Sequence, residues 1–264
     1  MMLRGRRIWF QVFSTATGGV LFLFLVAPIF MSIMGSAKGI PEAISDPRII
    51  GSLILSFYCG ALATVFSLLF GVPLAYVLSR YKFRGKNVMD ALIDLPILIP
   101  HNAAGIALLF IFGPRTSFGG IFSGIGLSFL DSVAGIVLAM SFVSAPYMVR
   151  TTQDAFQSIN QDMEDAASNL GASPQTVFTD ISLPLASRGI ISGCMLTWAR
   201  AVSEFGAVMV LAYYPKTAPV LLFDVLVGEG LNKALPITGL LLVTGLIVLF
   251  CFRSLGKIFN YSTN

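Results

Sequence analysis

The chain has 264 residues, of which 56% are hydrophobic and 11% are charged, and its net charge is +4. A soluble domain carries about a quarter charged residues, so this chain has too little polar surface to form a water-soluble globule. The small positive charge, without a basic stripe that alternates with aromatic residues, argues against a nucleic-acid-binding protein. The composition predicts an all-α polytopic membrane protein in which residues 1–264 form one transmembrane domain within the lipid bilayer.

Long runs with few charges predict about six transmembrane helices, because a helix needs about 20 apolar residues to cross a bilayer. The expected spans cover residues 8–36, 50–79, 90–112, 133–150, 189–213 and 234–252. The first span follows Arg4, Arg6 and Arg7, is too long for a signal peptide and lacks a small-x-small cleavage site at its end. We therefore expect it to remain as a membrane helix.

Two prolines, Pro96 and Pro100, lie four residues apart inside the third span. Prolines free backbone carbonyls and kink a helix, which a membrane protein tolerates where other helices or water satisfy those groups. We therefore expect this helix to face other helices or a transport pathway rather than lipid. The glycine-rich stretch 113–132 is expected on the outer side, as a re-entrant or interfacial segment.

Residues for covalent or metal chemistry are scarce. Cys59, Cys194 and Cys251 lie far apart inside apolar segments, so we expect buried small hydrophobic residues rather than a metal site or disulfides. The single histidine, His101, is expected to be a hydrogen-bonded packing residue. No Gly-x-x-x-x-Gly-Lys-Ser/Thr loop occurs, so the chain cannot bind ATP by the usual route. We expect no catalytic residue, no metal and no cofactor bound by this chain.

The basic residues near the span ends predict the orientation, because cytoplasmic loops carry an excess of Lys and Arg. One side of the membrane collects Arg4, Arg6, Arg7, Arg80, Lys82, Arg84, Lys86, Arg150, Arg188, Arg253 and Lys257, and the other only Lys38, Arg48, Arg115, Lys216 and Lys233. The asymmetry places both termini and the loop 151–188 in the cytoplasm. We therefore expect a multi-pass protein of the cell membrane.

The cytoplasmic loop has the pattern of two short helices. Ser158 with Gln161 indicates a capping box, and Gly171 lies where a C-terminal cap needs a left-handed residue. Ser173 and Pro174 then predict the N-cap and the first position of a second helix. The sequence predicts a helix-turn-helix outside the bilayer.

One motif in this loop has fixed spacing: Asp165-Ala166-Ala167, three residues, Gly171, nine residues, and Ile181-Ser182-Leu183-Pro184. It resembles the EAA loop of ABC-importer permeases, with Asp165 in place of glutamate and Glu164 directly before it. The resemblance implies that an ATPase docks on this loop, with coupling residues Glu164, Asp165, Ala166, Ala167, Gly171, Ile181, Leu183 and Pro184. The alternative is an ordinary interfacial amphipathic helix between two spans.

Arg200 and Glu204 are the only charged residues deep inside any predicted span. At about 1.5 Å per residue, Arg200 lies about 16 Å into the fifth span, where an unpaired charge is costly. The two residues can pair on one helix face, in a stripe with Thr197 and Ala207 and beside Ser203. Two interpretations stay open: the pair fixes helix packing or a gate, or Arg200 contacts a passing anion.

The segments 198–207, 211–215 and 94–109 are similar to those of permeases for molybdate and tungstate and, less closely, for sulfate. The resemblance implies type I ABC importer permease architecture, with a cytoplasmic coupling helix between spans four and five. It implies a homodimer, two ATP-binding cassette subunits that hold ATP and Mg at the cytoplasmic face, and an external substrate-binding protein. Transport by alternating access then needs no enzyme chemistry in this subunit.

Two alternatives come from other classes of protein. An ion-coupled secondary transporter would use Arg200 and Glu204 as its coupling site, but such proteins show repeated halves and midplane acids without an adjacent cation. An intramembrane enzyme or a membrane scaffold is the other alternative, and an enzyme would need a nucleophile with a base, or metal ligands, which one histidine and scattered cysteines do not supply. The choice among molybdate, tungstate, sulfate and other oxyanions stays open, because the external binding protein normally sets it.

Overall fold

The computed structural model of this chain describes the backbone of residues 2–261 and the side chains of residues 9–251 and 254. Five basic side chains that entered the predicted orientation lie outside this described part, namely Arg4, Arg6, Arg7, Arg253 and Lys257. Every element within residues 2–261 is a helix. The all-α prediction is confirmed.

The chain forms two compact units, one containing Gly51–Leu221 and the other the residues up to Ile50 together with Leu222–Cys251. The second of these contains α1 (Met2–Ser36), α2 (Ile40–Ser45) and most of α13 (Leu231–Tyr261), whereas α3 (Pro47–Arg80) and α12 (Ala218–Glu229) have residues in both units. We describe each unit by itself.

Close backbone contact joins the end of α1 and the start of α2 to α13. Gly239 lies against Ser36, and Gly39 lies against the ring of Pro236, so closely that a Cβ atom on either glycine would clash. Small residues therefore allow the two parts of this unit to approach each other. Near the same crossing, Lys233 lies 3.8 Å from the carboxylate of Glu42, an exposed and therefore weak ion pair.

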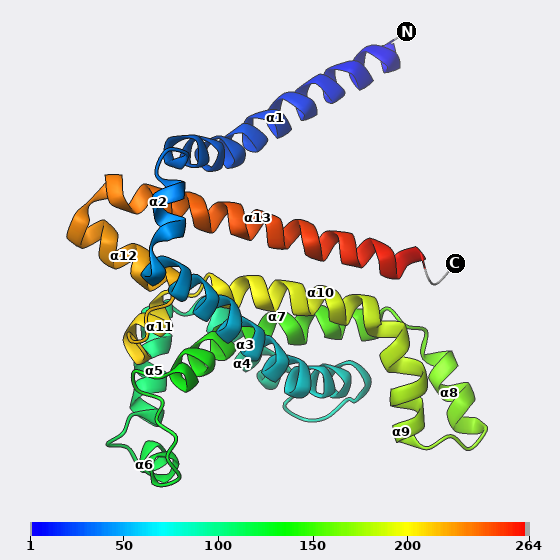
Figure 1. Ribbon diagram of the computed structural model, residues 1–264. Helices are drawn as coiled ribbons and strands as arrows, with labels where there is room; N and C mark the ends of the chain where they lie inside the picture. The colour runs from blue at the N-terminus through cyan, green and yellow to red at the C-terminus, as the bar shows by residue number, and fades with distance from the viewer. Residues whose placement is uncertain (1, 262–264) are drawn as a thin grey trace. The chain divides into compact units, whose positions relative to one another are not determined.

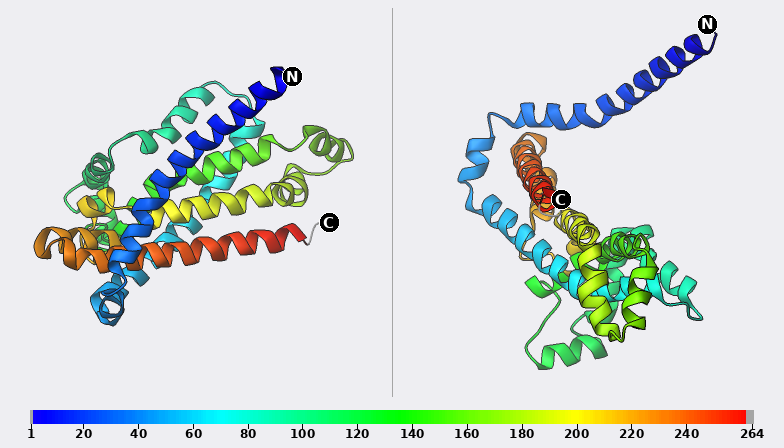
Figure 2. Two further views of the ribbon diagram at one scale, coloured as in Figure 1. Left: turned by 90° about the horizontal axis from the view of Figure 1, so that it is seen from above. Right: turned by 90° about the vertical axis from the view of Figure 1, so that its right-hand side faces the viewer.

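The larger unit is built on α7 (Val133–Gln157) and α10 (Leu183–Val202), which pack side by side along their lengths (Figures 1 and 2). Gly193 of α10 faces Met148 of α7, and an added Cβ atom would lie 3.1 Å from the methionine sulfur. The glycine thus allows the two helices to approach closely. Part of α3 completes this core, which contains Val72, Ala75, Leu78, Met148, Val149, Phe156, Ala186 and Ile190.

The segment predicted as the third span is not one straight helix. α4 (Lys86–Leu98) and α5 (His101–Phe112) meet at an angle of 114°. Ile99 at the break is extended, with ψ of 146°, because the ring of Pro100 disfavours a helical conformation for the residue before it. Pro96 lies inside α4, so the chain turns at Pro100 rather than at Pro96.

The segment predicted as the fifth span is also broken. α10 ends at Val202, and α11 (Gly206–Leu211) begins after three residues that are not helical. Glu204 lies in this break, and its side chain accepts the N–H of Ala207 at 2.8 Å, which satisfies a group that the start of a helix leaves unpaired. The prediction of one continuous helix with Arg200, Glu204 and Ala207 on a common stripe is therefore wrong.

Four helices in the described residues are long and apolar enough to cross a membrane, namely Trp9–Ser36, Pro47–Arg80, Val133–Gln157 and Leu231–Cys251. The bent pair of α4 and α5 makes a fifth if it is one span. The two broken segments pack on each other within the larger unit, through α5 and α11. The polytopic architecture is thus confirmed, with two predicted spans replaced by broken helices.

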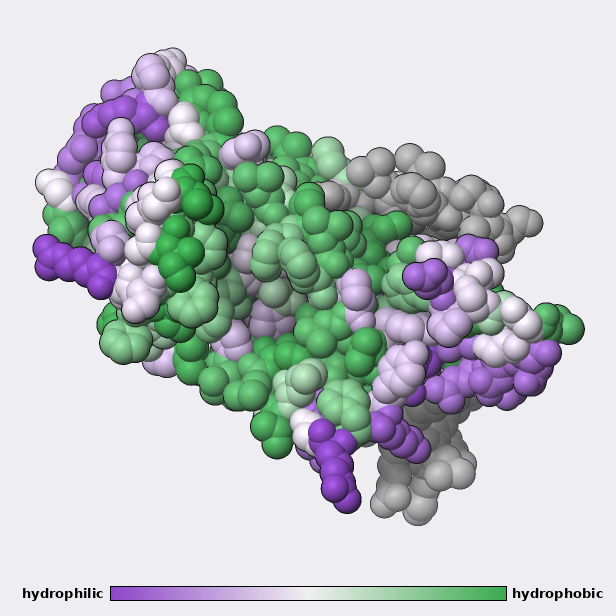
Figure 3. Space-filling view, turned by 90° about the horizontal axis from the view of Figure 1, so that it is seen from below, coloured by the Kyte–Doolittle hydropathy of each residue, from purple (hydrophilic) through white to green (hydrophobic). Residues whose placement is uncertain are grey.

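The stretch predicted on the outer side contains a short helix, α6 (Ser117–Gly124), whose N-cap Thr116 accepts the N–H of Gly119. Four aromatic rings pack around it in tilted or edge-to-face pairs, those of Phe112, Phe118, Phe122 and Phe129. Elsewhere many large hydrophobic side chains are exposed, and Figure 3 shows broad hydrophobic areas on the face that it draws. Such a surface suits contact with lipid.

The contact between α5 and α11 gives a stability prediction. A Cβ atom on Gly105 would lie 2.7 Å from Cβ of Val210 and 2.9 Å from the carbonyl oxygen of Ala207. We expect Gly105→Ala to lower the thermal midpoint of the purified protein in detergent, because overpacking costs about 1–3 kcal/mol. Gly51→Ala is the control, because Gly51 is helical with no atom within 4 Å of an added Cβ. An unchanged midpoint for Gly105→Ala would show that α5 and α11 can move apart without loss of stability.

Candidate functional site

The loop 151–188, predicted to be cytoplasmic, contains three short helices between α7 and α10: α8 (Gln161–Asn169), α9 (Pro174–Val177) and a π-helical turn, η1 (Phe178–Ser182). α8 and α9 extend beyond the ends of α7 and α10 (Figure 1). The loop therefore projects from the helical body, as the predicted helix-turn-helix requires.

Two of the predicted caps are present, at the end of α8 and the start of α9, whereas the cap at the start of α8 differs from the prediction. Gly171 has φ of +90° and Ser173 accepts the N–H of Thr176, as the sequence predicts. The N-cap of α8, however, is Asn160, which accepts the N–H of Asp162 at 3.1 Å. Ser158 instead ends α7. The predicted capping box is therefore wrong, because α7 continues several residues beyond the expected end of its span.

Glu164 of α8 is buried, and its carboxylate accepts three hydrogen bonds from two residues. Arg80, the last residue of α3, donates from Nε to Oε2 at 2.7 Å and from Nη2 to Oε1 at 2.8 Å. Ser182, the last residue of η1, donates its hydroxyl to Oε1 at 2.7 Å. The side chains of Arg80 and Glu164 are 8% and 9% exposed. This bidentate buried pair joins the end of α3, α8 and the start of α10.

The remaining residues of the predicted coupling loop divide into an exposed and a partly buried set. Asp165, Ala166, Gly171 and Pro184 are exposed, whereas Ala167, Ile181 and Leu183 are partly buried. Two large apolar residues of the loop also face outward, because Leu170 is 89% and Met163 is 52% exposed. The loop thus has an anchored side, where Glu164 lies, and an outward side of small and apolar residues.

A second ionic cluster fixes α4 to α7. Arg150 of α7 donates from Nε to Asp94 Oδ1 at 2.7 Å and from Nη1 to Asp90 Oδ1 at 2.6 Å, and Nη1 also donates to Gln153 Oε1 at 2.7 Å. One guanidinium therefore has both carboxylates of α4 as acceptors. The sequence pattern indicates only the orientation of Arg150 relative to the membrane and does not predict this contact with the carboxylates of α4, which lie about sixty positions earlier.

The two broken helices meet at a cavity of about 570 Å³. Its lining residues come from the two breaks and the helix starts that follow them: Pro100, His101, Asn102, Arg200, Ser203, Glu204, Phe205 and Gly206. Gly206 fits closely against His101 and Asn102, where a larger residue would clash. The predicted pathway residues Arg200, Ser203 and Glu204 are thus brought together, whereas Thr197 is buried in α10 and does not line the cavity.

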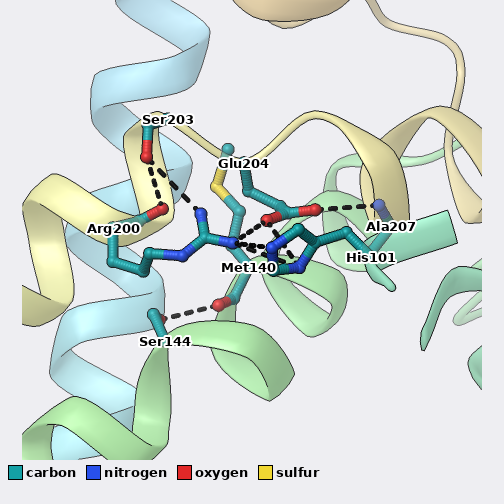
Figure 4. A network of polar contacts seen from close by, with 7 residues as sticks. All are labelled: His101, Met140, Ser144, Arg200, Ser203, Glu204 and Ala207. Carbon is teal, nitrogen blue, oxygen red and sulfur yellow. Dashed lines mark hydrogen bonds and ion pairs between the residues drawn. The ribbon is translucent and has the colours of Figure 1, made fainter. Parts of the chain in front are cut away.

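Arg200 is the centre of the polar network in this cavity (Figure 4). Its Nη2 donates to Glu204 Oε2 at 2.6 Å and lies 2.9 Å from Nε2 of His101. Its Nη1 lies 3.4 Å from the hydroxyl of Ser203, a longer contact. Glu204 is 1% exposed, whereas the side chains of Arg200 and His101 are 19% and 42% exposed. The pair is therefore buried on the carboxylate side and open to the cavity on the guanidinium side.

His101 and Asn102 are the residues of this cavity that sequence reasoning missed. His101 was predicted to be a packing residue, because nothing in the sequence relates it to Arg200, which lies 99 positions later. The available signal was its position directly after Pro100, which turns the chain and starts a new helix there. In the described residues, no group of three or more His, Cys, Asp or Glu side chains could hold a metal ion.

A family model described as "Binding-protein-dependent transport system inner membrane component" matches residues 67–261. The chain belongs to this family. The permease carries no catalytic role of its own in such a system, and its energy-coupling partner is a separate subunit.

Several curated relatives are similar to this permease over most of its length. It is 38% identical to the molybdate/tungstate transport system permease protein of Pyrococcus furiosus over 251 residues, which cover 94% of this chain and 96% of that protein. A probable molybdenum ABC transporter permease protein of Haloferax volcanii is 36% identical over 87% of this chain and 84% of its own length. A probable sulfate transport system permease protein of Anthoceros angustus is 36% identical over 72% of this chain and 67% of its own length.

Solved structures show the same fold at low sequence identity. A bacterial ABC transporter that imports the acidic polysaccharide alginate aligns with a TM-score of 0.76 and 16% identity, over 96% of each chain. The methionine ABC transporter in inward-facing conformations aligns with a TM-score of 0.62 and 15% identity, over 82% of this chain and 96% of that chain. The permease therefore has the fold of an ABC importer transmembrane subunit.

The buried pair of Arg80 and Glu164 gives a prediction for stability. We expect Arg80→Ala to destabilise the permease by about 3–5 kcal/mol, because it leaves the carboxylate of Glu164 buried without its cation. The double variant Arg80→Leu with Glu164→Leu should recover much of this loss, because no buried charge remains. Thermal unfolding of the purified protein in detergent measures both.

Arg84→Ala is the matched control, because Arg84 is an exposed arginine of the same basic segment. It should change the thermal midpoint little. Equal midpoints for Arg80→Ala and Arg84→Ala would contradict a structural role for the buried pair.

Proposed function

We propose that this permease is the transmembrane subunit of an ATP-driven importer for molybdate and tungstate. The observation that carries the proposal is the 36–38% identity over 94% of the chain to molybdate/tungstate permeases from several archaea. Sulfate is the second candidate, because probable sulfate transport system permease proteins are 33–36% identical over 72–87% of the chain. The difference in coverage favours the metal oxyanions.

The working complex contains two copies of this chain, two ATP-binding cassette subunits and an external substrate-binding protein. The binding protein follows from the family, whose members belong to binding-protein-dependent systems. ATP and Mg bind to the ATPase subunits. This chain has no phosphate-binding loop of its own. The ATPase subunits dock on the loop 151–188, and both chain termini lie in the cytoplasm with that loop, as the distribution of basic residues indicates.

The outward side of the loop suits insertion into a groove of a partner protein. Leu170 and Met163 supply exposed apolar anchors, and the small side chains of Ala166 and Gly171 let a partner approach closely. Buried apolar anchors carry most of the binding energy of protein interfaces. Asp165 adds one exposed charge to this surface.

The anchored side of the loop provides the transmission. Glu164 is bonded to the end of α3 and to Ser182, which leads directly into α10. A displacement of α8 by the ATPase subunits therefore moves both of these helices with it. Arg150 likewise couples α4 to α7. Closure of the ATPase dimer thus changes the access of the pathway by rigid movement of helices.

The substrate proposal is tested with the whole complex. We would reconstitute the permease, its ATPase and its binding protein in liposomes, and measure ATP hydrolysis with molybdate, tungstate or sulfate outside. Molybdate or tungstate should stimulate hydrolysis and accumulate inside. Stimulation by sulfate alone would assign the complex to sulfate, and hydrolysis that no oxyanion changes would refute the oxyanion importer.

The turn at Gly171 tests the coupling role. A β-branched residue is strained at φ of +90°, although nothing lies within 4 Å of an added Cβ atom. We expect Gly171→Val to reduce molybdate uptake strongly while ATP hydrolysis continues, because the distorted turn displaces α8 from its partner. Gly171→Asn is the matched control, because asparagine tolerates the left-handed conformation, and it should keep most uptake. Normal uptake by the folded valine variant would remove the turn from the coupling mechanism.

A further inference from the structure

The cavity between the two broken helices has the features of a binding site that the proposed function leaves unassigned. We propose that it binds the tetrahedral oxyanion transiently during transport through Arg200, and that Glu204 is a tethered competitor that occupies Arg200 when the anion is absent. This inference rests on the proposed function, since the oxyanion is the substrate of that importer. In an ion pair that serves only helix packing, Glu204 would not affect an anion. Here Glu204 competes with the anion for Arg200.

Arg200 has hydrogen-bond donors to spare. A guanidinium carries five N–H groups in a planar fork that matches the oxygens of an oxyanion. The carboxylate of Glu204 and the imidazole of His101 both contact Nη2, and Ser203 makes only a long contact with Nη1. Among the described residues, none accepts a hydrogen bond from Nε. The side chain of Arg200 is 19% exposed and lines the cavity.

Other hydrogen-bond donors belong to residues that line the same cavity. The first backbone hydrogen bond of α5 runs from the N–H of Ala104 to the oxygen of Pro100. The N–H groups of His101 and Asn102 therefore precede the hydrogen-bonded part of this twelve-residue helix, at its positive end. The hydroxyl of Ser203 lines the cavity as well. The site thus combines one cation with neutral donors. Its volume of about 570 Å³ admits an oxyanion with some of its water.

Glu204 can release Arg200 without losing both of its partners. Its Oε2 accepts from Arg200 at 2.6 Å, whereas its Oε1 accepts the N–H of Ala207 at 2.8 Å. Because the two oxygens have different donors, the carboxylate stays bonded to the start of α11 when an anion replaces Oε2. Its negative charge then repels the anion and keeps binding weak. A transport site needs such weak binding, because the substrate must leave it again.

The test uses the permease–ATPase complex in detergent without the binding protein, and measures retention of radiolabelled molybdate. Glu204→Gln keeps the size of the side chain and an acceptor for Ala207 but removes the charge. We expect its affinity for molybdate to rise about tenfold, which corresponds to about 1.4 kcal/mol, and its maximal import rate in liposomes to fall because release slows. The double variant Arg200→Gln with Glu204→Gln removes the cation without stranding a charge, and it should lose retention.

Lys82→Gln is the control for a general charge effect, because Lys82 is an exposed cation of the segment between α3 and α4, outside the cavity. It should leave retention unchanged. A wild-type complex that imports molybdate, together with a folded Glu204→Gln variant whose affinity is unchanged or lower, would overturn the site and leave the proposed function standing. A wild-type complex that neither imports nor retains molybdate would instead refute the proposed function. Ser203→Ala gives a second, milder variant, for which we expect weaker retention.

Discussion

The constraint on which this structure depends is that every charge removed from water must find its partner within the chain. An unpaired ion in a membrane protein is costly, and the permease meets the constraint with three arginines. Arg80 holds Glu164, Arg150 holds the carboxylates of α4, and Arg200 holds Glu204. In the first two cases the pair joins distant segments. In the third it lies where the chain itself is broken, so that one carboxylate serves both a cation and a helix start.

These three pairs assign different tasks to different parts of the molecule. The pair under the loop 151–188 joins α3 to α8, and the cluster on Arg150 joins α4 to α7. The pair at the cavity leaves donors of Arg200 and an edge of His101 open to the cavity. A rigid connection suits the transmission of force, and an incompletely satisfied cation suits an anion that passes. The permease therefore has firm ionic contacts under the loop 151–188 and between α4 and α7, and an incompletely satisfied cation at the cavity between the broken helices.

The features that the sequence predicted are those with a local physical cause. Composition predicted the polytopic helical fold, and single residues predicted the left-handed turn at Gly171 and the cap at Ser173. The contacts that the sequence did not predict join residues far apart in the chain, such as Arg80 with Glu164 and Arg200 with His101. Helical periodicity carries no information on such contacts. Helical periodicity also favoured a continuous fifth span, because apolar residues continue across the break between α10 and α11. That break is stabilised by the side chain of Glu204, which accepts the N–H of Ala207.

The division of the loop 151–188 into two sides has an evolutionary consequence. The residue that ties the loop to the permease, Glu164, is hidden from any partner, whereas the outward residues such as Leu170 make no contribution to that tie. Substitutions on the outward surface can therefore change its shape and polarity without disturbing the buried ion pair. The same helical body can in this way acquire affinity for a different partner through changes at exposed positions alone.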